Sequence, residues 1–231
     1  MKSIVIGGAG FIGSLVSQAL IASGREVTVV GRRPPGAHTA ALPCAYRCAD
    51  LGNRAQMREI LNPGCEVIDL AYATVPKTSY GDPVFDLFAN LPGSVGLLEE
   101  AMAVGVRRLL LVFSGGTVFG TPCALPMAES HPTAPISPYG ITKLTIDHYA
   151  LMFHHTRDLP VVGGAAGQSL RSPTAFSDRP GFPRRRHRRH SYATRDRDLR
   201  RCGNHSILHP CQRCGQRHSY GLGFWGRFLN L

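Results

Sequence analysis

A tyrosine and a lysine in the second half of the chain have the types and spacing needed for proton transfer. They belong to a segment Ser-Pro-Tyr-Gly-Ile-Thr-Lys, which places Tyr139 four residues before Lys143 at the start of a stretch with helical spacing. Residues four apart share a helix face, so the phenol and the ammonium can meet. An adjacent cation lowers the pKa of a phenol from its usual value of about 10. The pair therefore indicates acid–base catalysis, and a solvated helix face is the alternative.

Glycines near the N-terminus have the spacing of a phosphate-binding turn. Residues 7–13 read Gly-Gly-Ala-Gly-Phe-Ile-Gly and satisfy both G-x-x-G-x-x-G and G-x-G-x-x-G. Glycine permits the tight turn and lets backbone N–H groups approach a pyrophosphate, while the following helix supplies a positive dipole. Because the segment lies between a strand-like and a helix-like stretch, it predicts a dinucleotide-binding loop. A purely structural glycine turn is the alternative.

The end of the second predicted strand bears on the choice of dinucleotide. An acidic residue at this point usually hydrogen-bonds the adenosine ribose hydroxyls. This chain has Gly31 there, followed by Arg32 and Arg33. Two guanidiniums could receive a 2′-phosphate, which makes NADP an alternative to NAD, and a solvated pair of arginines would look the same. Asp50, further along the chain, is the next candidate for an adenine contact, although a surface aspartate has the same appearance in sequence.

The elements that would position these residues alternate along the first 160 residues. Short apolar runs typical of buried parallel strands occur at 3–6, 26–30, 66–71 and 108–113. Helical spacing occurs at 11–23, 53–61 and 94–104, and again from residue 138. Such alternation predicts right-handed βαβ units and a Rossmann-type, doubly wound parallel sheet of the α/β class.

Charge divides the chain near residue 160. The first 160 of its 231 residues carry 12 basic and 12 acidic side chains, whereas residues 161–231 carry 14 arginines and three aspartates and hold the whole net charge of +11. The alternation of strands and helices also stops there. We therefore expect an NAD(P)-binding domain over residues 1–160 and a disordered, arginine-rich tail over residues 161–231.

Cysteine usage and hydropathy bear on the compartment. Seven cysteines at irregular spacing do not predict a disulfide framework. Glycines interrupt the apolar N-terminus, and no small-residue cleavage site follows, so a signal peptide is not expected. No apolar run reaches the roughly 18 residues of a membrane span. These features favour a cytoplasmic protein with no membrane partner.

Together, the motifs resemble the extended short-chain dehydrogenase/reductases, specifically the NAD-dependent epimerase/dehydratase family that acts on nucleotide sugars. The resemblance covers residues 1–160 in the family's order and is strongest to the UDP-glucose 4-epimerase branch. The matching segments are residues 7–13, 50–51, 70–72, 90–94, 114–120 and 138–143.

The resemblance implies a reaction and a set of contacts. Tyr139 would take a proton from the sugar C4 hydroxyl, while Lys143 holds the nicotinamide ribose and lowers the Tyr139 pKa. The family's catalytic Ser or Thr is replaced by Gly115, so Ser114 or Thr117 would substitute. The implied cofactor contacts are Gly7, Gly10, Phe11, Ile12, Gly13, Arg32, Asp50, Leu51, Leu70, Ala71, Tyr72, Asn90 and Lys143. The resemblance further implies a UDP-sugar substrate, a homodimer and no metal.

The tail departs from this family. Its relatives open the corresponding region with a strand that ends Arg-Pro-x-Asn-x-Tyr-Gly and then build the substrate domain, and neither feature is present in the written sequence. However, residues 165–171 can be encoded as GCG GCC GGC CAA TCC CTA CGG, which read one nucleotide later gives Arg-Pro-Ala-Asn-Pro-Tyr-Gly. Residues 209–215 can be shifted likewise to Ile-His-Ala-Asn-Asp-Val-Ala, which resembles a later family segment.

Both matches require the same one-nucleotide shift, which suggests that a frameshift near residues 161–164 replaced the substrate domain. The chain would then be a truncated and impaired enzyme, and the gene sequence across codons 155–175 decides the point. A non-catalytic dinucleotide-binding module that acts through a partner is the second interpretation.

Two other interpretations of the tail have weaker support. The basic run at 184–190 could neutralise nucleic-acid phosphates, but no aromatic interleaving accompanies it, so nucleic acid is not the favoured partner. Cys202, His205, Cys211 and Cys214 could suggest a zinc knuckle, but the spacing between His205 and Cys211 is shorter than that of usual zinc fingers.

Overall fold

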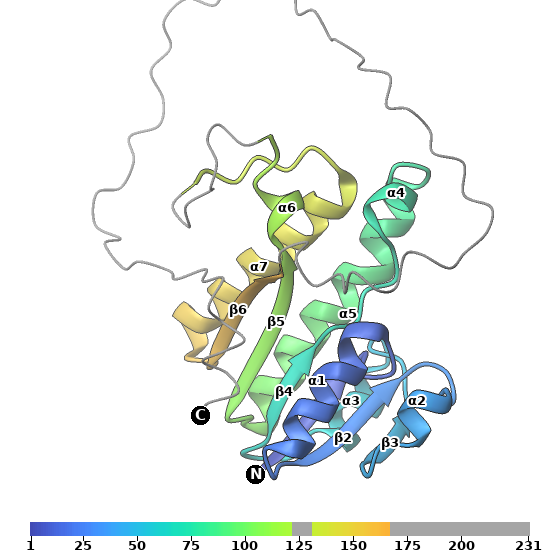
Figure 1. Cartoon of the computed structure of the whole chain (residues 1–231). Helices are drawn as coiled ribbons and strands as arrows, with labels where there is room; N and C mark the ends of the chain where they lie inside the picture. Colours follow the sequence, from blue (N-terminus) through green and yellow to red (C-terminus); the bar gives the residue numbers. More distant parts are fainter. Residues whose placement is uncertain (122–130, 167–231) are drawn as a thin grey trace, which may run out of the picture. The chain divides into compact units, whose positions relative to one another are not determined.

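The structure is a computed structural model that describes residues 1–121 and 131–166. Its six strands form one parallel sheet in the order β3-β2-β1-β4-β5-β6 (Figure 1). This arrangement confirms the predicted Rossmann-type, doubly wound sheet. The strands are β1 (Lys2–Ile6), β2 (Glu26–Gly31), β3 (Ala45–Cys48), β4 (Glu66–Asp69), β5 (Arg108–Ser114) and β6 (Val161–Ala166).

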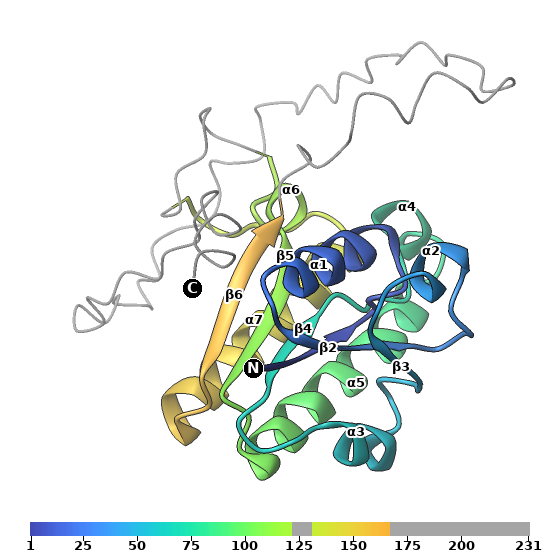
Figure 2. The ribbon, with the colours of Figure 1, turned by 60° about the horizontal axis from the view of Figure 1, so that its bottom comes forward.

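Helices cover both faces of this sheet. Figure 2 shows α1 on one side and α3, α5 and α7 on the other. The strand order reverses between β1 and β4, which opens a crevice at the carboxyl ends of the strands, where ligands of doubly wound sheets bind. The helices are α1 (Phe11–Ala22), α2 (Ala37–Ala40), α3 (Arg54–Ile60), α4 (Pro76–Ser79), α5 (Pro83–Val104), α6 (Gly115–Val118) and α7 (Pro138–Arg157).

The core consists of two layers because successive strand side chains point to opposite faces of the sheet. Ile4 and Ile6 pack in the layer under α3, α5 and α7. Val5 packs in the other layer with Val16 and Leu20 of α1. Since both faces are covered, most residues of the central strands are apolar, which explains the short apolar runs in the sequence.

Helix α5 is longer than the sequence predicted. It begins at Pro83 rather than near residue 94, and Pro92 lies inside it. An internal proline usually marks a helix end, which hid the first half. The start has ordinary signals: Asp82 accepts a hydrogen bond from the Phe85 N–H at 2.8 Å, and Pro83 occupies the first turn.

The sheet continues beyond the predicted boundary at residue 160. Strand β6 pairs with β5 from Leu109 opposite Val161 to Ser114 opposite Ala166. Two consecutive glycines made this strand hard to recognise, since glycine weakens a strand. A Cβ at Gly163 would lie 3.1 Å from the Phe113 ring, so the glycine lets that ring pack closely. The proposed change of frame across residues 165–171, the basic run and the Cys202–Cys214 group fall, apart from Ala165 and Ala166, outside the described residues.

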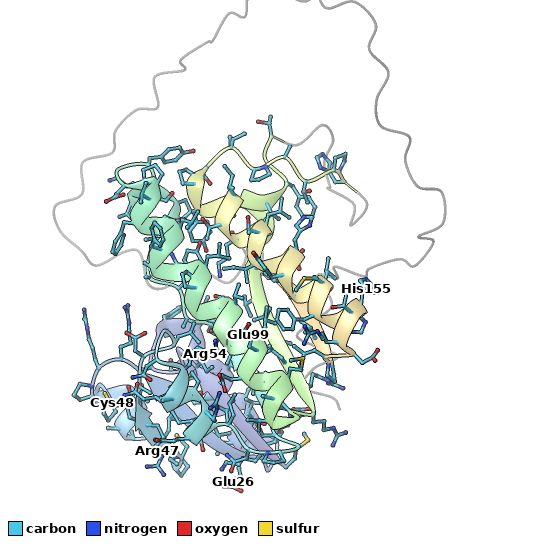
Figure 3. The ribbon with its side chains drawn as sticks, turned by 180° about the vertical axis from the view of Figure 1, so that it is seen from behind. Glu26, Arg47, Cys48, Arg54, Glu99 and His155 are labelled. Carbon is cyan, nitrogen blue, oxygen red and sulfur yellow. The ribbon has the colours of Figure 1, made fainter. Side chains whose placement is uncertain are left out.

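Ion pairs join α3 to α5 on the outer side of this layer. The buried Glu100 carboxylate accepts hydrogen bonds from Arg58 Nε at 2.7 Å and from Arg54 Nε at 3.0 Å. Arg54 also reaches Glu99 at 2.7 Å, and Figure 3 shows these two side chains close together between the helices. No helix within residues 1–121 and 131–166 is long and apolar enough to cross a membrane.

Candidate functional site

The glycine loop between β1 and α1 forms a tight cradle. Gly7 adopts a left-handed φ of 77°, and its N–H donates to Val30 O at 2.8 Å. A Cβ at Gly13 would lie only 2.3 Å from Gly7 O, so no other residue fits there without backbone movement. Helix α1 begins with Gly10 at its N-cap, where no side chain caps the helix. The N–H groups of the first turn therefore suit an anion such as a pyrophosphate.

A cleft of about 470 Å³ opens beside this loop, at the carboxyl ends of β1, β2 and β4. Most of the predicted cofactor contacts line it, and the structure thus brings together four separate sequence motifs. Phe11, Ile12, Gly13 and Lys143 do not line it; the first three form the first turn of α1. The predicted contacts that do line it are Gly7, Gly10, Arg32, Asp50, Leu51, Leu70, Ala71, Tyr72 and Asn90.

The tyrosine–lysine pair lies on α7, whose start is held by its neighbours. Ser137 caps the helix by accepting the Gly140 N–H at 3.1 Å, and the Tyr139 N–H donates to Ser79 Oγ at 3.2 Å. A Cβ at Gly140 would lie 2.5 Å from Thr117 O. The glycine between Tyr139 and Lys143 is therefore needed for α6 to pack against α7.

Tyr72 connects this pair to the cleft. Its ring contacts that of Tyr139 edge-on, with 4.7 Å between centroids. On the other side the Lys143 ammonium lies 4.0 Å from the Tyr72 centroid and 6.0 Å from the Tyr139 centroid. Lys143 Nζ also donates to Val112 O at 3.1 Å. Tyr72 lines the cleft, and Tyr139 and Lys143, which do not line it, contact Tyr72.

Burial shifts the protonation of the groups around this pair. It lowers the pKa of Lys143 to about 8, although the nearby carboxylates Asp69 and Asp86 oppose this shift. Burial raises the pKa of Asp69 to about 6, against the effect of the Ala71 N–H, which donates to Asp69 Oδ1 at 2.9 Å. Burial, and then Asp86, raise the pKa of Tyr139. The net shift of the Tyr139 pKa in the chain by itself is thus upward, opposite to the lowering expected from Lys143 alone.

The two candidate substitutes for the family's catalytic hydroxyl lie between β5 and α6. Ser114 ends β5 and occupies the N-cap of α6 without capping it through its side chain. Thr117 Oγ1 donates to Ser114 O at 3.2 Å, a bond within the turn. Neither residue lines the cleft, and Gly115 between them offers no hydroxyl.

A buried polar network behind the tyrosines was missed by the sequence analysis. Asp86 of α5 is completely buried, and its carboxylate accepts hydrogen bonds from the Thr74 hydroxyl and, at 2.7 Å, from the Thr142 hydroxyl. Asn90 donates to Asp86 O at 2.7 Å and accepts the Ala73 N–H at 2.7 Å. The network thereby fixes α5, α7 and the loop after β4 relative to one another.

A sequence signal for this network did exist. Asp86 and Asn90 are four residues apart, and they are the two buried residues of the segment 83–90. A helix whose inward face carries two polar groups among exposed apolar ones indicates a buried network. The signal was overlooked because the helix was expected to begin after this segment.

A glycine cradle at the switch point of a parallel sheet, beside a cleft at the carboxyl ends of its strands, is typical of dinucleotide-binding α/β domains. A profile of the NAD dependent epimerase/dehydratase family matches residues 3–186. The chain belongs to that family, and the resemblance found in its sequence is confirmed.

Similar proteins of known function agree with this assignment. UDP-glucose 4-epimerase of Mycolicibacterium smegmatis is 35% identical over 166 residues, which cover 69% of this chain and 53% of the relative. The Thermus thermophilus UDP-glucose 4-epimerase, solved in complex with NAD, superposes with a TM-score of 0.66 at 30% identity, covering 71% of this chain and 54% of that one.

A dehydratase is equally similar in structure. The dTDP-glucose 4,6-dehydratase of Streptomyces venezuelae, solved with NAD bound, gives a TM-score of 0.66 at 28% identity, covering 71% of this chain and 55% of the other. The chain spans about half the length of the curated relatives that it matches.

Proposed function

We propose that the chain carries the cofactor-binding and acid–base part of a nucleotide-sugar epimerase or dehydratase, with a UDP-sugar as the favoured substrate. The observation that carries this proposal is the position of Tyr139 and Lys143, which pack against Tyr72, a residue that lines the cleft beside the glycine cradle. The similarity to UDP-glucose 4-epimerases and to a dTDP-glucose dehydratase supports the substrate class. The cytoplasmic location remains a prediction.

The residues present fit a nicotinamide dinucleotide. The cradle has no space for a Cβ at Gly13, and the first turn of α1 has no side-chain cap at Gly10, so its N–H groups can face a pyrophosphate. Gly7, Gly10, Leu70 and Ala71 would contact the dinucleotide, whose nicotinamide ring accepts and returns a hydride when bound.

The protein's own groups would handle the proton. In the proposed reaction the Tyr139 phenolate removes the proton of the sugar C4 hydroxyl and later returns it. The Tyr139 pKa is raised in the chain by itself, so positive charge brought close to the phenol is needed to generate the base. Lys143 contributes one such charge, held in place by Val112 O. Ser114 or Thr117 would position the sugar hydroxyl.

We propose that the residues that follow the sheet are translated from a different reading frame. We infer that the reading frame changes near residues 161–164, within β6, so that the segment that follows the NAD(P)-binding domain is translated from another frame and the contacts to the sugar are impaired. The gene sequence tests this directly. If codons 165–171, read one base later, do not encode Arg-Pro-x-Asn-x-Tyr-Gly, the proposal fails.

Replacing Tyr139 by phenylalanine tests the proposed function. The purified chain should bind a nicotinamide dinucleotide and exchange hydride slowly with a UDP-sugar. Tyr139→Phe should slow this exchange by about 10²- to 10⁴-fold, the usual contribution of a general acid–base group, with dinucleotide affinity unchanged. Single-turnover absorbance of the reduced nicotinamide provides the measurement.

Tyr149→Phe is a matched control, because Tyr149 lies on the same helix but is 39% exposed. Equal rates for Tyr139→Phe and the unmodified chain would contradict the catalytic role. Tight dinucleotide binding without any exchange would instead favour the second interpretation, a non-catalytic binding module.

We also propose a homodimer formed through α5 and α7. These helices lie side by side on one face in Figure 3 and expose large apolar side chains, among them Phe85 at 56% and Ile141 at 53%. Phe85→Glu should convert the dimer to a monomer, because a charge buried between two copies is costly. Leu15→Glu, on α1 across the sheet, should leave the mass unchanged in light scattering. A monomeric unmodified chain would contradict the dimer.

A further inference from the structure

The side chain of Tyr46 fills the space at the end of β2 where the acidic residue that usually binds a ribose would begin. A Cβ built on Gly31 would lie 2.4 Å from Tyr46 Oη. The phenol of Tyr46, from the neighbouring strand β3, therefore occupies the volume where a side chain at position 31 would begin. An aspartate or glutamate at this position would require Tyr46 to move. With Tyr46 packed in this way, position 31 accommodates a glycine and no carboxylate.

Side chains of β3 fix the loop that follows Gly31. The Tyr46 hydroxyl donates to Arg33 O, and Cys48 Sγ lies 3.5 Å from Arg32 O, which accepts its weak hydrogen bond. Residues two apart in a strand point to the same side, so Tyr46 and Cys48 act together. With both carbonyls bound to β3, the backbone that carries the two arginines has a defined position.

The arginine side chains themselves are available to a ligand. Arg32 and Arg33 are exposed and line the cleft, and neither forms an ion pair with any residue of the described ranges 1–121 and 131–166. Asp50 is the one carboxylate among the described lining residues, and its Oδ1 accepts the Gly52 N–H at 2.9 Å. This part of the cleft therefore has an excess of positive charge.

We propose that Arg32 and Arg33 form a subsite for the 2′-phosphate of NADP, so that the chain binds NADPH more tightly than NADH. This inference rests on the proposed dinucleotide-binding function and specifies the cofactor of that same site. Guanidinium groups match a phosphate with paired, charge-assisted hydrogen bonds. A ribose with a free 2′-hydroxyl would meet no carboxylate at Gly31 and would gain little from the two cations.

Titration of the full chain with NADPH and with NADH, followed by their fluorescence, tests the subsite. NADPH should bind at least about 10-fold more tightly, corresponding to one charge-assisted contact pair. The double substitution Arg32→Ala and Arg33→Ala should abolish this preference because it weakens the binding of NADPH. The affinity for NADH should change by less than about threefold. In competition, adenosine 2′,5′-bisphosphate should displace NADPH better than adenosine 5′-monophosphate does.

Arg47→Ala is the matched control, because Arg47 is an exposed arginine of β3 that does not line the cleft. Figure 3 shows it beside Cys48 at this edge of the sheet. It should leave the preference unchanged, and circular dichroism should show that all variants stay folded. NADH binding as tightly as NADPH would overturn the subsite but leave the proposed function standing. Failure to bind either dinucleotide would overturn both.

Discussion

Replacing Gly13 by valine should abolish dinucleotide binding and destabilise the fold. The first carbon of the new side chain would lie 2.3 Å from Gly7 O and 2.5 Å from Gly8 Cα. Both are backbone atoms of the cradle, so the clash can be relieved only if the loop and α1 move apart. Overpacking of a close-packed site typically costs about 1–3 kcal/mol, and we expect the upper end because no flexible side chain can yield. The displaced first turn would also lose its alignment with a pyrophosphate.

Gly96→Ala provides a matched control for this prediction. Gly96 is also a buried helical glycine, but a Cβ there would meet only the flexible Arg54 side chain, at 3.4 Å. Alanine favours a helix interior over glycine by roughly 0.5–1 kcal/mol, so this variant should be as stable as the unmodified chain or more so. Urea unfolding and NADPH fluorescence measure the two effects. If Gly13→Val binds the dinucleotide normally, the cradle does not hold the pyrophosphate.

The glycine loop is a feature that the sequence could predict. The spacing of Gly7, Gly10 and Gly13 between a strand and a helix is a local pattern, and local patterns determine the turn. The apolar runs likewise predicted β1, β2, β4 and β5, since a strand covered on both faces is mostly apolar. Parallel pairing and the switch point then follow from the right-handed connections.

Other features depended on contacts between distant segments. Gly31 looks like a missing acidic residue in the sequence, and only the pairing of β2 with β3 places the Tyr46 hydroxyl where its side chain would lie. Strand β6 was missed because its glycines have low strand propensity, and its stability comes from pairing with β5. The Tyr139 pKa could not be inferred from Lys143 alone, because burial and Asp86 act on it through the fold.

Among the residues that act through contacts between distant segments, Asp86 should have the largest effect on function. A carboxylate held next to two tyrosines and a lysine favours the protonated form of each neighbour. It accordingly raises the pKa values of Tyr72 and Tyr139, and it opposes the lowering of the Lys143 pKa. Asp86 is too deeply buried to meet a ligand, so we regard it as a positioning residue that also sets the charge state of the acid–base pair.

Replacing Asp86 should therefore have separable effects on stability and on proton transfer. Asp86→Ala leaves the Thr74 and Thr142 hydroxyls without their acceptor, and such a loss typically costs about 1–3 kcal/mol of unfolding free energy for each buried group. Asp86→Asn preserves the shape and one acceptor oxygen and should be milder in stability. It removes the negative charge, so the pKa values of Tyr139 and Lys143 should both fall, and the proposed hydride exchange should begin at lower pH.

The pH dependence of the tyrosine Cζ signals in NMR spectra reports the change in the Tyr139 pKa directly. The signal of Tyr139 is identified by its loss in Tyr139→Phe. Asp82→Asn is the control: it removes one charge from the same helix, but Asp82 is exposed and asparagine caps a helix equally well. It should move neither pKa. If Asp86 had a structural role alone, Asp86→Asn would lower the stability without changing the Tyr139 pKa. A fall in the Tyr139 pKa with stability nearly retained would show that the buried carboxylate is what keeps the phenol protonated until a cationic group binds beside it.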